Sequence, residues 1–304
     1  MKRISVLSLL LLLACSGSDA TPRSNHVLVI GIDGVRVDAL WQAATPELDE
    51  LIAGGTVTYD AFAGGVLGTA SEQGTWSGPG WASILTGVWI DKHGVRFNGF
   101  VGARFDEYPH FFARVREQKP DASLSSFVTW GPIHDHILTS AEADTAFWPE
   151  EASDQAEGDV AVTQAVVAHL AAEDPDVVFV QLDEVDHQGH VAGFSPTVSE
   201  YVGALEVVDS QIGQMIDAVQ ARSTIDDEDW LIVVTTDHGG LGVAHGEQSA
   251  EERTIFVIVN GGTARSGHEI SPGPGHTAIA PTAMKHLDLP IDPAWGWESE
   301  PFGL

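Results

Sequence analysis

Five stretches of the chain are almost continuously apolar and rich in Val and Ile. Strands of a parallel sheet have this pattern, because helices cover both faces of the sheet. Each stretch is short, as expected for a strand, and turn-forming or polar residues bound it. We therefore predict strands over residues 26–32, 123–130, 177–182, 230–236 and 254–260.

The segments between these strands have the apolar spacing of helices. The predicted helices cover residues 46–53, 80–86, 110–118, 155–172, 197–222 and 280–286. Strands that alternate with helices indicate an α/β fold, here a doubly wound, mostly parallel sheet with helices on both faces. Residues 96–107 and 144–158 lack either period and are predicted to be loops at the rim.

The first residues differ from the rest of the chain. Lys2 and Arg3 precede a short apolar run, residues 6–13, as in a secretory signal peptide rather than a membrane span. Residues 12–15, Leu-Leu-Ala-Cys, resemble a bacterial lipobox, which implies cleavage before Cys15 and acylation of its thiol. The alternative is an ordinary signal peptide in which the cysteine is incidental.

These features predict three parts: a signal peptide at residues 1–14, a polar tether at 15–25 and one catalytic domain at 26–304. Several acyl chains on Cys15 would form a stable anchor, whereas one chain alone binds marginally. We expect an exported protein anchored by lipid to a bacterial membrane and facing the periplasm or the cell exterior. Cys15 is the only cysteine, so the mature chain forms no internal disulfide.

The composition is strongly acidic, which limits the kinds of partner and substrate that the protein can bind. The chain has 14 Lys and Arg against 44 Asp and Glu, a net charge of −30. A nucleic-acid-binding protein needs a basic patch, so this class is excluded. An anionic substrate would need a local positive centre, such as bound metal.

Two polar residues follow or precede the predicted elements at places where catalytic groups are common. Asp33 ends the first predicted strand, where a buried carboxylate needs a partner such as a metal ion, although Asp-Gly is also a common turn. Ser77 lies in a Gly- and Pro-rich entry to a predicted helix, where backbone N–H groups favour an anion. Its alternative role is that of a helix N-cap.

Carboxylates and imidazoles follow two further strands. Asp186 and His190 are four residues apart after the strand at 177–182, and Asp237 and His238 follow the strand at 230–236, with His245 shortly after. In a doubly wound sheet, the carboxyl ends of the strands collect the catalytic groups. Oxygen and nitrogen ligands of this kind suit zinc.

Four motifs in order resemble the alkaline phosphatase superfamily, and most closely its type I phosphodiesterase and nucleotide pyrophosphatase branch. They are IGIDG at 30–34, TGVWIDKHGV at 86–95, DHQGH at 186–190 and TDHGG at 236–240. The resemblance covers nearly the whole mature chain. It implies a phosphoric ester hydrolase that acts on two zinc ions through a phosphoseryl intermediate.

The resemblance also implies roles for individual residues. One zinc would be held by four residues: Asp33, Ser77, Asp237 and His238. The second would be held by Asp186, His190 and His245, with His276 as the competitor of His245. Asn98 would contact a phosphoryl oxygen, or is a turn residue.

At two positions the sequence departs from related families, and these departures reduce the range of activities that the resemblance allows. Gln181 stands where alkaline phosphatases carry a glutamate of a magnesium site, so we expect no third metal. Trp81 stands where nucleotide pyrophosphatases carry histidine and where sulfatases need arginine to form formylglycine, which disfavours a sulfatase. Trp76 is among the aromatic residues near Ser77 or a strand end: some of them would form an apolar wall that stacks a base or an aryl group, and the alternative is that they belong to the core.

The predicted activity is hydrolysis of a small phosphate ester, with a phosphodiesterase or pyrophosphatase favoured. The alternatives are a phosphomonoesterase, a phosphoryl-group transferase on lipid or glycan head groups, and a non-enzymatic surface lipoprotein. The sequence leaves open the substrate, the metal, which could be another divalent ion, and the oligomeric state.

Overall fold

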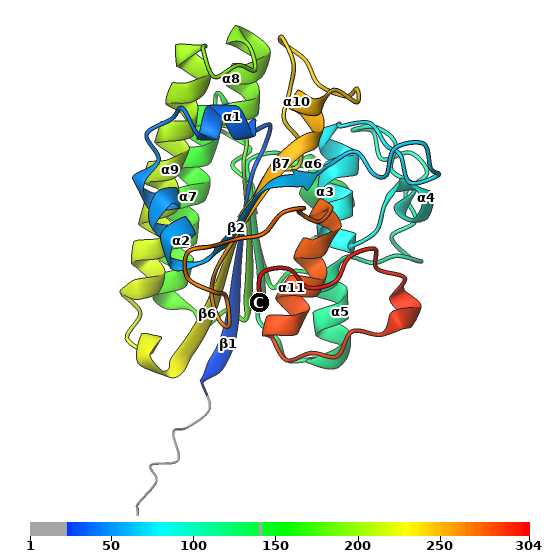
Figure 1. Ribbon diagram of the computed structural model, residues 1–304. Helices are drawn as coiled ribbons and strands as arrows, with labels where there is room; N and C mark the ends of the chain where they lie inside the picture. The colour runs from blue at the N-terminus through cyan, green and yellow to red at the C-terminus, as the bar shows by residue number, and fades with distance from the viewer. Residues whose placement is uncertain (1–22, 140–141) are drawn as a thin grey trace, which may run out of the picture.

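The computed structural model describes residues 23–139 and 142–304, and one eight-stranded sheet forms its centre (Figure 1). The strands lie in the order β4-β3-β5-β1-β6-β7-β2-β8. Their bounds are β1 Ser24–Ile32, β2 Thr56–Phe62, β3 Leu124–Val128, β4 Thr145–Phe147, β5 Val177–Leu182, β6 Glu228–Thr235, β7 Thr254–Gly261 and β8 His268–Glu269. The predicted α/β fold with a mostly parallel sheet is confirmed.

The central strand β1 pairs in parallel with β5 on one side and with β6 on the other. β7 is antiparallel to β6, so the prediction of a parallel strand over 254–260 was wrong. The reason is the connection: it contains only the four-residue helix α10, Ala250–Arg253, and returns at the same end of the sheet. A parallel pair needs a crossover to the opposite end.

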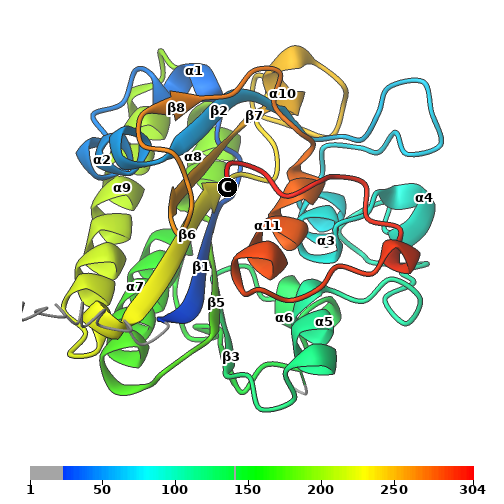
Figure 2. The same cartoon turned by 60° about the horizontal axis from the view of Figure 1, so that its bottom comes forward.

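Helices cover both faces of the sheet, as Figure 1 shows. The helices on one side are α1 Val37–Leu40, α2 Pro46–Gly54, α7 Gln155–Ala172, α8 Glu184–Ala192 and α9 Ser199–Gln220. Those on the other are α3 Ser77–Thr86, α4 Ile90–His93, α5 Phe111–Gln118, α6 Pro132–His136 and α11 Ile279–His286. After α11 the C-terminal segment folds across this second side towards α4, where Lys92 pairs with Glu298 (Figure 2).

Two hydrophobic cores lie between the sheet and its helices, and β1 contributes to both. Val27 and Val29 pack into the core with α3 and α11, whereas Leu28 and Ile30 pack into the core with α7 and α9. Alternate side chains of a strand point to opposite faces, which explains why residues 27–32 of this strand, all of them buried, include no polar side chain.

Several elements were missed or shifted in the sequence analysis. α8 lies between the predicted strand at 177–182 and the predicted helix at 197–222, where we predicted no element, and β4 lies in the predicted loop at 144–158. β2 and β8 form the far edge, where short strands have no long apolar run. β1 begins at Ser24, because the first two residues of this strand pair with β6; the predicted tether extended to residue 25.

The predicted signal peptide, Cys15 and residues 16–22 of the predicted tether lie outside the described residues, so export and the lipid anchor stay predictions. Within the ranges 23–139 and 142–304, none of the helices combines the length and the apolar character that crossing a membrane requires.

Candidate metal centre and active site

Three buried aspartates meet at the carboxyl ends of β1, β5 and β6. Asp33 follows β1, Asp186 lies in the first turn of α8 after β5, and Asp237 lies two residues beyond β6. One oxygen of each, Oδ1 of Asp33, Oδ1 of Asp186 and Oδ2 of Asp237, is buried without a hydrogen-bond partner. Buried carboxylate oxygens are costly unless a donor or a cation faces them.

Three histidines present the same nitrogen to these carboxylates. The Nδ1 atoms of His190, His238 and His245 lie 2.9, 2.8 and 2.8 Å from the backbone carbonyl oxygens of Val243, Gly239 and Thr75. A carbonyl oxygen only accepts, so each Nδ1 carries the proton and donates it. In the neutral rings Nε2 is then a free lone pair, as in histidines that bind metal.

The first group of candidate ligands surrounds the Nε2 of His238. This atom lies 3.2 Å from Oδ2 of Asp237, 3.5 Å from Oδ1 of Asp33 and 3.3 Å from Oγ of Ser77. Asp33, Asp237 and His238 are therefore close enough to hold one cation. Together with Ser77, they are the four residues that the family resemblance assigned to the first zinc.

The second group lies around Asp186. Its Oδ2 is 3.2 Å from Nε2 of His190, one helical turn further along α8, and its Oδ1 is 3.5 Å from Nε2 of His245. The two imidazole Nε2 atoms are only 3.0 Å apart. Two lone pairs at this distance need a proton or a metal ion between them, so this donor set fits a metal.

The structure brings His245, rather than His276, to the second group. Among the described residues, the groups that could hold a metal are Asp186 with His238 and His245, and Asp33 with Asp237 and His238; a third group lies at the other end of the sheet. His276 is buried with its ring against Trp89, at a centroid distance of 4.9 Å. The assignment of each residue as a zinc ligand stays a prediction.

In the absence of a cation, the like charges of the carboxylates in the site repel one another. Burial, followed by repulsion from Asp237, raises the pKa of Asp33 well above its ordinary value of 3.8. Burial and the charge of Asp186 do the same to the pKa of Asp237. The hydrogen bond with Asp186 raises the pKa of His190 to about 9, whereas burial lowers the pKa of His238. A dication would relieve this repulsion.

Ser77 is the first residue of α3, where the helix approaches the end of β6. A Cβ added at Gly80 would lie 2.9 Å from the Cβ of Asp237, so this approach requires glycine. The N-cap is Trp76 rather than Ser77, which excludes the alternative role of Ser77 as the cap. The Ser77 hydroxyl instead faces His238 at the start of the helix, where the helix dipole favours an anion.

Asn98 lies beside this helix start. Its Oδ1 accepts a hydrogen bond of 2.8 Å from the backbone N–H of Gly78. This contact fixes the orientation of the amide and leaves the exposed side chain's Nδ2 free to donate. The predicted contact with a phosphoryl oxygen needs such a donor.

Two partners of Asp33 were missed in the sequence analysis. The indole N–H of Trp81 donates to Oδ2 of Asp33 over 2.8 Å, and Nε2 of Gln181 lies 3.3 Å from the same oxygen. Trp81 is fully buried against Gly31, where an added Cβ would lie 2.3 Å from the ring. The glycine within an otherwise Val- and Ile-rich strand was the available signal for this close packing.

A pocket of about 400 Å³ opens beside the two groups of candidate ligands. Trp76, which precedes Ser77, and Gly246, which follows His245, line it together with Arg96 and Phe97. The ring of Trp76 packs edge-on against the ring of Phe97, with centroids 6.3 Å apart. The Phe97 side chain is 62% exposed, so the pocket has an aromatic wall that is open to solvent.

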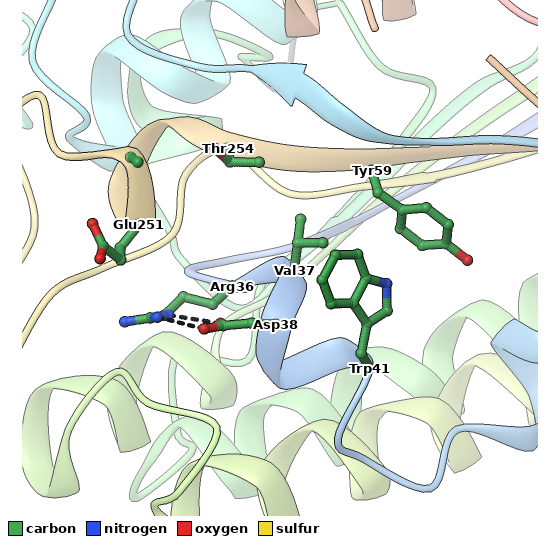
Figure 3. A pocket seen from close by; sticks show the side chains of 8 residues that line it. Arg36, Val37, Asp38, Trp41, Tyr59, Glu251 and Thr254 are labelled. Atoms are coloured by element: carbon green, nitrogen blue, oxygen red, sulfur yellow. Dashed lines mark hydrogen bonds and ion pairs between the residues drawn. The ribbon is translucent and has the colours of Figure 1, made fainter. Parts of the chain in front are cut away.

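A separate pocket of about 240 Å³ lies behind the turn at Gly239 and Gly240, which follows His238. None of the predicted site residues lines it (Figure 3). Figure 3 shows Arg36 paired with Asp38, and the ring of Trp41 next to Tyr59. Arg36 also donates to the carbonyl oxygen of Gly240 over 3.3 Å. Arg36, which lines this pocket, therefore supports the turn after His238 from outside. The pocket that adjoins the candidate ligands and Ser77 is the one of about 400 Å³.

A family model described as type I phosphodiesterase / nucleotide pyrophosphatase matches residues 27–269. A 2,3-bisphosphoglycerate-independent phosphoglycerate mutase of Natronomonas pharaonis is 26% identical over 143 residues, which are 45% of this chain and 26% of the mutase. The chain thus matches about a quarter of that relative's length.

Two solved structures show the same fold. The phosphonate monoester hydrolase of Silicibacter pomeroyi has a TM-score of 0.68 and 16% identity, over 92% of this chain and 76% of the hydrolase. Murine ectonucleotide pyrophosphatase / phosphodiesterase 5, in complex with AMP, has a TM-score of 0.66 and 14% identity, over 89% of this chain and 96% of the murine chain.

The repulsion within the site predicts opposite effects of one substitution with and without metal. Asp237→Asn should stabilise the metal-free protein, because the amide removes a charge and its nitrogen can donate to Nε2 of His238. The gain should grow as pH rises above 3.8, since the raised pKa values make ionisation of the wild-type site costly there. Zinc should raise the melting temperature of the wild type more than that of the variant, which keeps only the second group of candidate ligands, Asp186, His190 and His245, intact.

Thermal unfolding in a chelator and in zinc, over a range of pH, measures both effects. A variant that is less stable than the wild type in the chelator at every pH would contradict this interpretation of the site.

Proposed function

Because the chain belongs to the type I phosphodiesterase / nucleotide pyrophosphatase family, and is thus a phosphoric ester hydrolase, we propose that it cleaves phosphodiesters with Ser77 as the nucleophile and two zinc ions as cofactors. The observation that supports this most strongly is the convergence of three unpartnered carboxylate oxygens and three imidazole Nε2 atoms next to the Ser77 hydroxyl.

The proposed metal ligands follow from the two groups of side chains. Asp33, Ser77, Asp237 and His238 would hold one ion, and Asp186, His190 and His245 would hold the other. Carboxylate oxygens and imidazole nitrogens are ligands that zinc accepts. When bound, two such ions supply positive charge for the attacking and the leaving oxygens of an in-line displacement.

The residues of the chain would then perform the transfer as follows. The Oγ of Ser77 forms a bond to phosphorus while the bond between phosphorus and the leaving ester oxygen breaks, and the serine proton ends on the leaving alcohol. Nδ2 of Asn98 donates to a non-bridging oxygen, in the orientation that Gly78 fixes. Water then cleaves the phosphoserine and restores the hydroxyl.

Gln181 favours a two-metal over a three-metal site. Its Oε1 accepts from the backbone N–H groups of Thr129 and Trp130, at 3.2 and 2.8 Å, and its Nε2 lies close to Asp33 and Asp183. The amide is thus fully engaged and uncharged, unlike the glutamate that it replaces. This supports an activity on diesters rather than the chemistry of alkaline phosphatases.

The aromatic pocket suggests the class of substrate. Trp76 and Phe97 offer ring surfaces directly before Ser77 and Asn98, and Arg96 adds a positive charge. A planar aryl or nucleobase group attached to the phosphate would stack there. Local positive charge also offsets the net charge of −30, which would otherwise repel an anionic substrate.

Phosphoryl transfer to an acceptor other than water is the second candidate. The similarity of part of the chain to a phosphoglycerate mutase favours it. Lipid or glycan head groups would be acceptors near a membrane. Adding alcohols to the assay separates the two functions. A transferase passes the phosphoryl group to the alcohol and forms a new phosphate ester, whereas a hydrolase passes it to water.

Replacing the nucleophile should separate chemistry from metal binding. Ser77→Ala should lower the rate of diester hydrolysis by on the order of 10³-fold or more, the scale seen when an enzyme loses its nucleophile. The variant should still bind zinc, because His238 and both aspartates of its group remain. Ser83→Ala, on the same helix, is the matched control for folding. Near-wild-type activity of the Ser77 variant would exclude a phosphoseryl intermediate.

The preference for diesters is tested with two chromogenic substrates. The zinc-loaded protein should hydrolyse bis-p-nitrophenyl phosphate with a higher kcat/KM than p-nitrophenyl phosphate, because Asn98 rather than a third metal holds the non-bridging oxygen. Asn98→Ala should reduce this preference. A wild type that prefers the monoester would assign the protein to the phosphomonoesterases.

The aromatic wall predicts a change in KM. Phe97→Ala should raise the KM for bis-p-nitrophenyl phosphate about 10-fold, in keeping with a stacking contribution of about 1–3 kcal/mol. Because Phe97 lies away from the candidate ligands, kcat should change little. Val101→Ala is the matched control: Val101 is exposed in the same loop but does not line the pocket. An equal KM for both variants would show that the aryl group binds elsewhere.

A further inference from the structure

Asp159, on α7, belongs to neither group of candidate ligands, yet its buried side chain accepts three hydrogen bonds. Its Oδ1 accepts from the hydroxyl of Thr129 over 2.6 Å and from the backbone N–H of Asp183 over 2.8 Å. Its Oδ2 accepts from the backbone N–H of Glu184 over 3.0 Å. The side chain therefore binds both residues at the start of α8.

α8 depends on this contact because it lacks a cap of its own. The first N–H groups of a helix have no partner within the helix and usually bind a capping side chain. At α8 the N-cap residue, Asp183, makes no side-chain capping bond. Asp159 supplies the missing acceptor from another helix, and its carboxylate also faces the positive end of the helix dipole.

The same short helix holds two of the proposed metal ligands. Asp186 lies two residues after Glu184, and His190 follows one turn later on the same face, with its Nε2 3.2 Å from Oδ2 of Asp186. Their distances to His245 depend on where the first turn of α8 lies. A shift of that turn would change the distance of 3.0 Å between the two imidazole Nε2 atoms.

A second connection links Asp159 to the other group of ligands. Thr129, which donates to Asp159, also donates its backbone N–H to Oε1 of Gln181 over 3.2 Å. Nε2 of Gln181 lies 3.3 Å from Oδ2 of Asp33. The network that surrounds Asp159 thus reaches one candidate ligand of the first group as well as two of the second.

We propose that Asp159 is a positioning residue of the metal centre, which fixes the first turn of α8 so that Asp186 and His190 face His245. This role rests on the proposed function of those residues as metal ligands. It assigns to α7, a helix without any predicted site residue, a direct influence on metal affinity.

The chain contains a matched case in which the same contact has no link to the site. Asp209, on α9, accepts from the backbone N–H groups of Leu48 and Glu47 at 2.8 and 3.2 Å, in the first turn of α2. The two aspartates are equally buried, at 1% and 2% exposed for Asp159 and Asp209. α2 holds none of the candidate ligands, so Asp209 caps a helix for stability alone.

The experiment compares Asp159→Asn with Asp209→Asn in the otherwise unchanged protein. An asparagine keeps the size of the side chain but replaces one acceptor oxygen with a donor, so a backbone N–H loses its partner. Zn²⁺ is titrated at pH 8, because burial raises the pKa of Asp159 to about 7. Thermal unfolding in a chelator is recorded for both variants.

Both variants should melt earlier than the wild type in the chelator, because each loses a cap. Only Asp159→Asn should weaken the binding of zinc, by about 10- to 100-fold for at least one equivalent, the range typical when a group that orients a metal ligand is replaced. Excess zinc should then restore its activity on bis-p-nitrophenyl phosphate. Asp209→Asn should bind zinc as the wild type does.

Unchanged zinc binding by Asp159→Asn, or equal weakening in both variants, would overturn the positioning role. If Asp159→Asn does not fold, Thr129→Val replaces it: this variant keeps the shape of the side chain and removes only the hydroxyl that orients Asp159. It should weaken zinc binding in the same direction, and unchanged binding would overturn the proposal. A wild type that binds no zinc would instead overturn the proposed function itself.

Discussion

The close approach of three buried carboxylates is the constraint on which the site depends. Within the described residues, the ion-pair partners of Asp33, Asp186 and Asp237 are histidines alone. An uncompensated buried charge costs several kcal/mol, and repulsion among three adds to this cost. Neutral imidazoles offer lone pairs to the same space, so a bound cation satisfies both kinds of ligand at once.

The surrounding structure keeps these groups together despite their repulsion. Backbone carbonyls fix the tautomers of the three histidines, Trp81 and Gln181 bind the second oxygen of Asp33, and Asp159 caps the helix that positions Asp186. Preorganisation of this kind lets binding energy go into the reacting geometry rather than into ordering the ligands.

The sequence predicted the parts of this arrangement that follow from local pattern. Apolar strands that end just before Asp33, a few residues before Asp186 and just before Asp237 placed candidate ligands at the carboxyl end of the sheet, and the structure brings all seven together. The sequence pattern did not predict α8, because a glycine and two histidines within DHQGH weaken the apolar periodicity that marks a helix. The direction of β7 and the partners of Asp33 depend on contacts between residues far apart in the chain, which no local pattern encodes.

The most direct test of the metal centre is X-ray diffraction from crystals of the zinc-loaded protein, measured on both sides of the zinc absorption edge. The structure predicts two anomalous peaks about 3.5–4 Å apart, as in two-metal sites. One should lie between Asp33, Ser77, Asp237 and His238, and the other between Asp186, His190 and His245. The absence of peaks from these two groups, with zinc bound elsewhere or not at all, would contradict the account.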